Sequence, residues 1–174
     1  MVDAWLQRLG QYERLQLLKA PLTEIWGIGA AQIFSEVSPA MHEEFALKHE
    51  ARWYQRFGHN FYGCCEPLHH KVDIVNRNIP RLQKISMSAW IDFDKAVENV
   101  RDEIVFAWKP NPAVFAAPVW DPEVVRKDME EKLEKAKNCI VEMHMKDIST
   151  VRYEPQRLWE WAQIAAEVTR KYEA

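Results

Sequence analysis

Glycine is scarce in this sequence, and its few cysteines are not arranged for disulfides. Only 5 of the 174 residues are glycine, and neither a GxGxxG nor a GxxxxGK[ST] phosphate-binding loop occurs. The cysteines number 3, and two of them are adjacent. No apolar run approaches the roughly 20 residues that a membrane-spanning helix needs, and residues 1–18 lack the apolar centre of a signal peptide. We therefore expect a cytoplasmic protein without a membrane partner.

The sequence also lacks an excess of positive charge. Its formal net charge is -3 at pH 7, which does not favour a nucleic-acid partner. The densest stretch of Lys and Arg, residues 126–137, alternates with Asp and Glu as a solvated helix face does. Tryptophan, in contrast, is abundant and offers a large area for burial or binding. The length predicts one domain over residues 1–174.

Amphipathic segments alternate with short apolar or aromatic ones along the chain. We expect helices at 3–18, 38–58, 68–77, 92–100, 121–136 and 154–168, and strands at 22–26, 60–65, 84–88, 103–108 and 139–145. Alternation of this kind predicts parallel strands that are joined by crossover helices. A complete (β/α)8 barrel takes about 250 residues. The predicted fold is therefore α/β, with four to five parallel βα units that form about half of such a barrel; an open doubly wound sheet is the alternative.

Three of the predicted strands have one apolar face and one small or polar face. Side chains alternate between the two faces of a strand, and the second kind of face carries Ser86, Ser88, Lys109, Glu142, His144 and Lys146. The interior of a structural barrel is usually filled by Val, Ile and Leu. A polar interior therefore indicates a cavity for a polar ligand, and a sheet with one face in solvent is the alternative.

Further polar residues follow the strand ends, where a barrel has its active-site mouth. Thiolate, carboxylate and imidazole all bind zinc, so Cys64, Glu66 and His69 are candidate zinc ligands; a buried thiol with surface histidines is the alternative. Adjacent strand residues point apart, which predicts Cys64 and Glu66 facing inward and Cys65 facing outward.

Lys146 and Asp147 follow the last predicted strand. They form a candidate acid/base or anion-holding pair, because a lysine in a cavity loses its proton readily. A surface ion pair is the alternative.

Four segments resemble, in the same order, the C-terminal half of uroporphyrinogen decarboxylase-like proteins, in particular a methyltransferase-like bacterial branch. They are residues 62–69, 79–88, 109–113 and 146–150, and the whole resemblance extends over about residues 26–167. It implies the C-terminal half of a (β/α)8 barrel. It also implies one of two reactions: decarboxylation of porphyrinogen acetate groups without a cofactor, or methyl transfer between a corrinoid protein and a thiol or methyl donor, often with zinc.

The resemblance also implies roles for individual residues. Cys64 corresponds to the first zinc-binding cysteine of the methyltransferases, but Tyr62 stands at the usual histidine, and Lys146 and Asp147 stand in place of the later cysteine. The expected catalytic residues are Lys146, Asp147 and His144. The expected substrate-binding residues are Glu66, Ser86, Ser88, Lys109 and Asn111. The expected metal ligands are Cys64, Glu66 and His69.

The expected partners follow from the same reasoning. A small-molecule substrate and a corrinoid protein are implied by methyl transfer. Half a barrel leaves two unpaired strand edges, so we also expect a homodimer or a complementary N-terminal half. A porphyrinogen-type decarboxylase and a non-catalytic half-barrel are the alternatives to a methyltransferase-like enzyme.

Overall fold

A single parallel sheet organises the computed structural model, which describes residues 2–14 and 20–173. Its strands are β1 (Trp26–Gly29), β2 (His59–Gly63), β3 (Leu82–Ser86), β4 (Val105–Trp108) and β5 (Val141–Met143). They lie in the sheet in chain order, and every neighbouring pair is parallel. A doubly wound sheet would instead reverse its order at a switch point. The predicted partial parallel β/α barrel is therefore confirmed.

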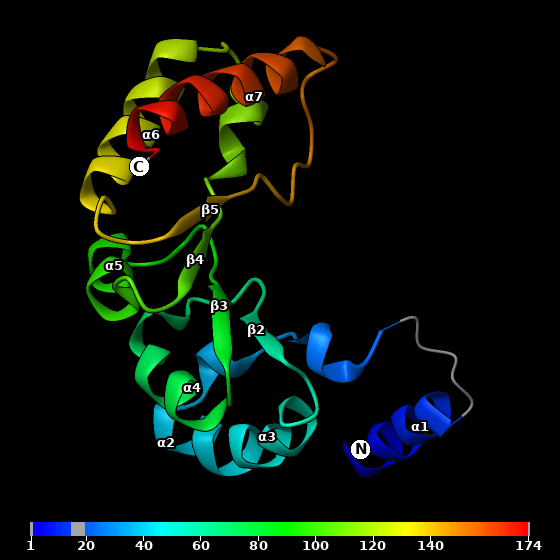
Figure 1. Cartoon of the computed structure of the whole chain (residues 1–174). Coiled ribbons are helices and arrows are strands. Elements are labelled where there is room, and N and C mark those ends of the chain that lie inside the picture. The colour runs from blue at the N-terminus through cyan, green and yellow to red at the C-terminus, as the bar shows by residue number, and fades with distance from the viewer. Residues whose placement is uncertain (1, 15–19, 174) are drawn as a thin grey trace.

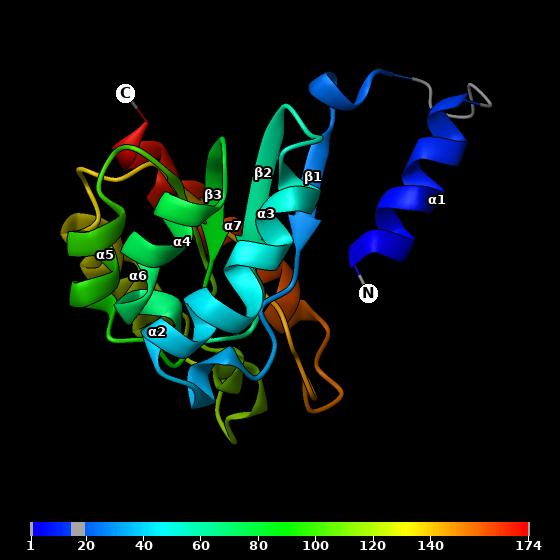
Figure 2. The same cartoon turned by 90° about the horizontal axis from the view of Figure 1, so that it is seen from below.

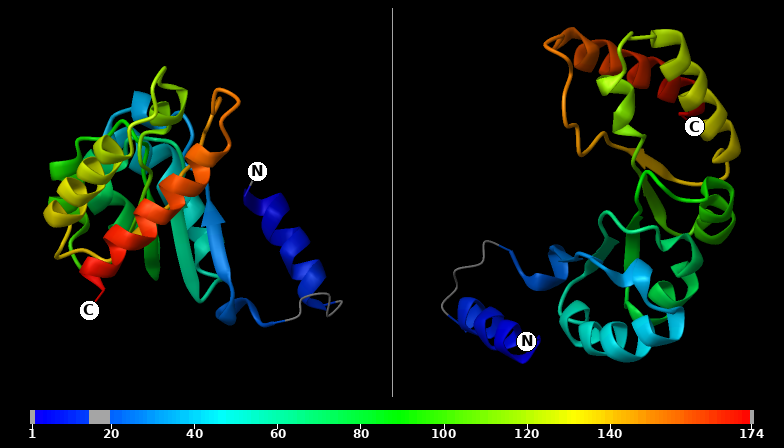
Figure 3. Two further views of the ribbon diagram at one scale, coloured as in Figure 1. Left: turned by 90° about the horizontal axis from the view of Figure 1, so that it is seen from above. Right: turned by 180° about the vertical axis from the view of Figure 1, so that it is seen from behind.

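Helices connect the strands and cover one face of the sheet. They are α1 (Val2–Arg14), α2 (Pro39–His42), α3 (Lys48–Tyr54), α4 (Val72–Asn78), α5 (Phe93–Val100), α6 (Pro122–Lys135) and α7 (Gln156–Thr169). Figure 1 shows α2 to α5 along the outer side of the strands, and Figure 3 shows the whole chain curving as an open C. Crossovers of one hand place successive helices on the same face. The other face, which we call the concave face, is left without a helical layer in the part of the chain that the structure describes.

Shorter helical segments complete the connections. The 3-10 helices are η1 (Leu22–Glu24), η2 (Phe34–Glu36), η4 (Leu68–His70), η5 (Pro112–Ala116) and η6 (Arg170–Tyr172), and the π-helical turn η3 (Glu43–Leu47) joins α2 to α3. Among the described helices, none combines the length and the apolar character that crossing a bilayer requires.

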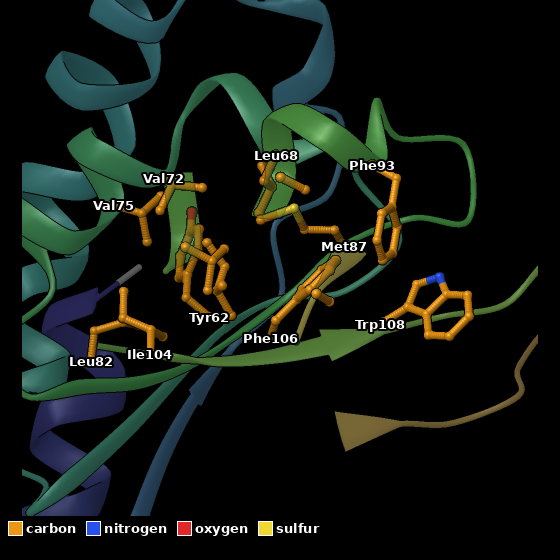
Figure 4. Close-up of a cluster of buried hydrophobic side chains, with 14 of the residues drawn as sticks. Tyr62, Leu68, Val72, Val75, Leu82, Met87, Phe93, Ile104, Phe106 and Trp108 are labelled. Carbon is orange, nitrogen blue, oxygen red and sulfur yellow. The ribbon is translucent and has the colours of Figure 1, made fainter. Parts of the chain in front are cut away.

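The hydrophobic core lies between the sheet and the helices (Figure 4). Met87, Phe106 and Tyr62 come from the strand side and are fully buried. They pack with side chains such as Leu68 and Val72 from the helical layer. Burial of one such side chain stabilises a fold by about 1.5–3 kcal/mol. The predicted apolar strand faces are therefore the ones that contact the helices.

Several predicted element boundaries need correction. The strands expected at 60–65 and 139–145 end earlier, as β2 (His59–Gly63) and β5 (Val141–Met143). Residues 22–26 were expected to form a strand, but Pro21 opens the 3-10 turn η1 and β1 begins only at Trp26. Helix 38–58 begins as predicted, with the Ser38 hydroxyl accepting a hydrogen bond from the Met41 amide. It ends earlier, at Tyr54, and its π turn breaks the four-residue spacing, so Phe45 is exposed while Leu47 is buried. The expected end of the first helix, residues 15–18, lies outside the described residues.

Helix α1 lies beside α3 at the β1 edge of the sheet. Asp3 forms an ion pair with Arg52 at 2.6 Å, and Leu9 packs against Leu22 and Phe57. In Figure 2, α1 runs opposite to β1, with the edge of β1 facing it. A helix of a β/α barrel runs antiparallel to its strands. Helix α1 therefore has the direction of a barrel helix that precedes β1.

Candidate functional site

The two adjacent cysteines lie where β2 ends and the chain turns. Gly63, the last residue of β2, has a φ of 117°, and a Cβ there would lie 2.1 Å from the Ser86 carbonyl oxygen. Beyond Gly63 the strand alternation no longer applies, and the Sγ atoms of Cys64 and Cys65 lie 3.4 Å apart. The prediction that Cys65 faces away from Cys64 is therefore wrong.

Lys146 brings an ammonium group to both thiols. Its Nζ lies 3.4 Å from Cys64 Sγ and 2.6 Å from Cys65 Sγ. Asp147 contacts the same residues: its Oδ1 lies 3.7 Å from Lys146 Nζ, and its Oδ2 lies 3.8 Å from Cys65 Sγ. The ends of β2 and β5 thus contribute two sulfurs, one cation and one carboxylate to one cluster. We call Cys64, Cys65, Lys146 and Asp147 the thiol cluster.

The charges in the thiol cluster favour a thiolate. Burial raises the pKa of Cys64, but hydrogen bonds from Cys65 and Lys146, with the charges of Lys146 and Lys109, outweigh it and hold that pKa below its usual value. The pKa of Lys146 is raised, chiefly because it donates to the Cys65 sulfur. Lys146 therefore keeps its proton and stabilises a negative sulfur. This is the opposite of the proton loss predicted for it.

Lys109 and Ser86 support the thiol cluster from neighbouring strands. Lys109 Nζ donates to the Cys64 carbonyl oxygen, and Ser86 Oγ donates to the same oxygen at 3.3 Å. Burial lowers the pKa of Lys109, and the nearby thiols oppose this effect. Ser88 Oγ accepts a hydrogen bond from the Trp90 amide at 3.1 Å. The position of Cys64 is thus fixed by two donors that reach it across the sheet.

A small pocket opens beside the thiol cluster. Its volume is about 110 Å³, and its walls include Cys65, Ser88, Trp90, Lys109, Lys146 and Asp147. Two cations and one aromatic ring therefore border a space that suits one small polar group of a substrate.

Glu66 follows the cysteines directly but is not part of the thiol cluster. Its Oε1 accepts from the Ile33 amide at 3.0 Å and its Oε2 from the Ser35 amide at 2.7 Å. Ile33 has a left-handed φ of 65°, which is strained for a β-branched residue. Burial raises the pKa of Glu66, but these amide bonds and the charge of Lys71 outweigh it, so the pKa lies below its usual value. The Glu66 carboxylate thus fixes the loop between β1 and α2.

Among the described residues, no hydrogen bond or ion pair joins the remaining predicted residues to the thiol cluster, although the charges of Lys109 and Lys146 act on His144. His69 packs against His70 with ring centroids 3.8 Å apart. Asn111 caps η5, with Oδ1 accepting from the Ala113 amide at 2.9 Å. His144 Nδ1 lies 3.6 Å from Glu142 Oε1 on the concave face, and burial and Lys109 lower the pKa of His144.

The predicted zinc ligands do not form one set. Glu66 is bound to the backbone amides of another loop, and among the described residues no three His, Cys, Asp or Glu side chains are grouped to hold a metal ion. The structure therefore does not fit zinc at Cys64, Glu66 and His69, which would need to converge at about 2.0–2.3 Å from one ion.

Sequence reasoning missed two residues of the site. Cys65 was assigned to the outer face because the strand was expected to continue through it. Trp90 was not among the predicted site residues, although it follows β3 by only a few residues; it is 71% exposed and lines the pocket. Its place just after a strand end was the available signal.

No protein-family model and no curated protein sequence matches this chain. The resemblance to uroporphyrinogen decarboxylase-like proteins therefore stays a prediction from the sequence motifs.

Proposed function

We propose that this chain carries a thiolate-based substrate site in a methyltransferase-like enzyme of the uroporphyrinogen decarboxylase type. One observation carries the proposal: the Lys146 ammonium contacts both cysteine sulfurs at the carboxyl ends of parallel strands. Loops after the strands form the active site in β/α barrels. A thiolate that is stabilised by a cation is a ready nucleophile.

The proposed reaction is transfer of a methyl group to or from sulfur. A thiolate sulfur of the thiol cluster attacks the methyl carbon, and a carbon–sulfur bond forms. The bond from that carbon to its carrier breaks, and both of its electrons stay on the carrier. A corrinoid on a partner protein is the proposed methyl carrier. Lys146 holds the sulfur deprotonated before the attack, so that no proton has to leave during it.

Two lysines give the site its preference for an anionic substrate. Lys109 and Lys146 both line the pocket of about 110 Å³, and Trp90 forms another part of its wall. A carboxylate there would be held by ammonium groups while Ser88 and Trp90 contact its carbon skeleton. The same arrangement also supports the alternative, a porphyrinogen-type decarboxylase, because that substrate is a polycarboxylate. The thiol cluster favours methyl transfer, since decarboxylation without a cofactor has no use for a thiolate.

The pH dependence of thiol alkylation tests the proposal. Iodoacetamide reacts with thiolates, and Cys139 is a reference within the same chain because burial raises the pKa of its thiol. We expect the alkylation of Cys64, followed by peptide mass spectrometry, to reach half its maximal rate at a clearly lower pH than that of Cys139. Equal titration of the two cysteines would contradict a thiolate site.

The open sheet supports a second proposal, that the chain associates with further β/α units. The sheet has five strands, whereas a closed barrel of this type has eight. The free edge at β1 carries Trp26 and Ile28, which are 42% and 62% exposed. A groove of about 360 Å³ separates this edge from α1 and is lined by Val2, Trp5 and Trp53, among others. Unpaired strand edges bind other strands, so we propose a homodimer or a complex with a complementary half that covers this edge.

Light scattering during size-exclusion chromatography tests the association. The chain has a mass of 20.5 kDa, and we expect a species of at least twice that mass at micromolar concentrations. Ile28→Lys should reduce the association, whereas Val119→Lys, at a position that is 76% exposed and away from β1, should not. A monomer at all concentrations would exclude the homodimer and leave only the complementary half, to be sought by co-purification with a neighbouring gene product.

A further inference from the structure

We propose that Cys64 and Cys65 form a vicinal dithiol that peroxide oxidises reversibly to a disulfide, and that this oxidation removes the nucleophile of the thiol cluster. The inference uses the same two cysteines as the proposed function. It does not depend on methyl transfer, because the oxidation needs only the two sulfurs and a peroxide.

The first support is the placement of the two sulfurs. Adjacent cysteines within a strand point to opposite faces, but these two lie past the end of β2 and their Sγ atoms are 3.4 Å apart. A disulfide bond is about 2.05 Å long. The sulfurs therefore have to approach by little more than an ångström. The bond closes a ring through the Cys64–Cys65 peptide, so side-chain rotation and a change of the backbone in this partly buried turn supply the approach.

The second support is access together with charge. Both cysteines are partly exposed and unpaired, and Cys65 lines the pocket that opens to solvent. Lys146 contacts both sulfurs, at 3.4 and 2.6 Å. One ammonium can therefore stabilise a thiolate at either position. Redox-sensitive cysteines are thiolates that are exposed and lie next to a second cysteine that resolves the first oxidation.

The oxidation proceeds in two balanced steps. One thiolate attacks an oxygen of hydrogen peroxide, the O–O bond breaks, and the departing hydroxide takes a proton to become water, which leaves a sulfenic acid. The neighbouring sulfur then attacks that sulfur, the S–S bond forms, the S–O bond breaks, and a second water leaves. In total, two thiols lose two electrons and two protons, and one peroxide becomes two waters. An external dithiol reverses the change by thiol–disulfide exchange.

Oxidation changes the charged partners of the Lys146 ammonium. A disulfide carries no negative charge, so the ammonium keeps only Asp147, at 3.7 Å, as a charged partner within the thiol cluster. The thiolate that would attack a substrate is then absent. The third cysteine offers a matched contrast, because Cys139 donates to the Val97 carbonyl oxygen at 3.6 Å and burial raises the pKa of its thiol.

Peptide mass spectrometry after peroxide treatment tests the proposal. Trypsin cleaves after Arg56 and Lys71 and releases both cysteines on the peptide 57–71, while Cys139 lies on a different peptide. After treatment with a small excess of hydrogen peroxide, blocking of free thiols and digestion, we expect this peptide to have lost two hydrogens. Dithiothreitol should restore its original mass and both reactive thiols.

Variants of Cys64, Cys65 and Lys146 separate a disulfide from other oxidation products. Cys64→Ser and Cys65→Ser, each in a Cys139→Ser background, should instead gain oxygen or form mixed disulfides. Lys146→Met should slow the loss of two hydrogens several-fold, because a smaller fraction of the sulfur is then thiolate, and Lys127→Met, at an exposed position of α6, should not. Stepwise gain of oxygen on the wild-type peptide, or disulfides only between chains, would overturn the proposal.

The failure of this inference and the failure of the proposed function are distinguishable. Oxygen adducts together with a low alkylation pKa would overturn the disulfide and leave the thiolate site in place. A reversible disulfide together with ordinary alkylation titration would support the dithiol and contradict the proposed thiolate nucleophile.

Discussion

Two groups of polar residues meet near the end of β2, and they have different kinds of partner. In the anchoring group, Glu66 binds the backbone amides of Ile33 and Ser35, and Lys71 Nζ donates to backbone carbonyls, including that of Val37 at 2.6 Å. In the thiol cluster, by contrast, the side chains of Cys64, Cys65, Lys146 and Asp147 contact one another.

The difference separates residues that hold the fold from residues that are available for chemistry. A carboxylate whose oxygens accept backbone hydrogen bonds is committed, because removing it leaves partly buried amides without that partner. Side chains that contact only one another and are open to solvent can exchange those contacts for a substrate. Adjacency in the sequence, as between Cys65 and Glu66, says little about which group a residue joins.

The largest effect that we expect is a loss of stability in acid through His42, whose pKa responds to the charges of Lys71 and Glu66 in the anchoring group. His42 is fully buried beside Tyr62, with 2.8 Å between His42 Nε2 and Tyr62 Oη. Burial first, and then the charge of Lys71, lowers the pKa of His42 to about 4, against an opposing effect of Glu66. The unfolded chain takes up this proton near pH 6.5 and the folded chain only near pH 4. The stabilisation is therefore complete above pH 6.5 and is lost as the pH falls towards 4, by about 3 kcal/mol.

Urea unfolding of the wild type and of His42→Gln between pH 7.5 and 4.5 measures this loss. The variant should lack the contribution of His42 to the acid destabilisation, whereas the exposed His49→Gln should retain it. An unchanged pH slope in His42→Gln would show that His42 is not held neutral in the fold.

The next effect tests Glu66 itself. Glu66→Ala removes the acceptor of two amides in a loop where Ile33 is strained, and we expect a loss of about 2 kcal/mol in the free energy of unfolding at pH 7. Because the folded pKa of Glu66 is lowered from 4.5, this stabilisation is present above pH 4.5 and is lost as the pH falls below it. Urea unfolding provides the measurement, with exposed Glu36→Ala in the same loop as the control. A loss of less than 0.5 kcal/mol would place Glu66 outside the anchoring group.

A smaller effect on stability, but a clear one on reactivity, is expected at Lys146. Lys146→Met removes the cation from both sulfurs, so the thiolate pKa should rise and alkylation at pH 7 should slow several-fold. The melting temperature should hardly change, since Lys146 is partly exposed. Alkylation rates and thermal unfolding of the same sample check both statements. A large loss of stability with unchanged reactivity would move Lys146 to the anchoring group.

The smallest effect concerns the concave face. Lys84 and Glu142 form an ion pair across it, with side chains that are 24% and 45% exposed. Exposed pairs of this kind contribute less than about 1 kcal/mol. Glu142→Gln should therefore change the free energy of unfolding of the monomer by less than about 0.5 kcal/mol. A larger loss that appears only at concentrations where the chain associates would indicate that a partner covers this face.

Most of the fold was predictable because strand and helix patterns alternate along the chain. The long helix α6 begins where the predicted range 121–136 begins, and Asp121 caps it by accepting hydrogen bonds from the amides of Glu123 and Val124. The apolar strand faces were predictable for the same reason, since alternate residues of a strand share a face. The start of β1 was not, because the apolar residues from Leu22 onward fit a 3-10 turn as well as a strand.

The site was less predictable than the fold. Alternation assigned Cys65 to the wrong side because nothing in the pattern shows that the backbone at Gly63 adopts a positive φ. Glu66 resembled a ligand because its two amide donors are distant in the chain: Ser35 lies 31 positions earlier and Ile33 lies 33 positions earlier. The convergence of Lys146 on the cysteines depends on the order of β2, β3, β4 and β5 across the sheet. Such long-range partners have no local signal in the sequence.

The sequential strand order has a consequence for how the molecule forms. Each strand pairs with the strand that precedes it in the chain, so each pairing closes a loop of one crossover only. Shorter sequence separation between contacting residues lowers the contact order of a fold, and a lower contact order favours faster folding. The thiol cluster, in contrast, joins residues 64 and 65 to residues 146 and 147. It therefore depends on every pairing from β2 to β5 and can form only once β5 has joined the sheet.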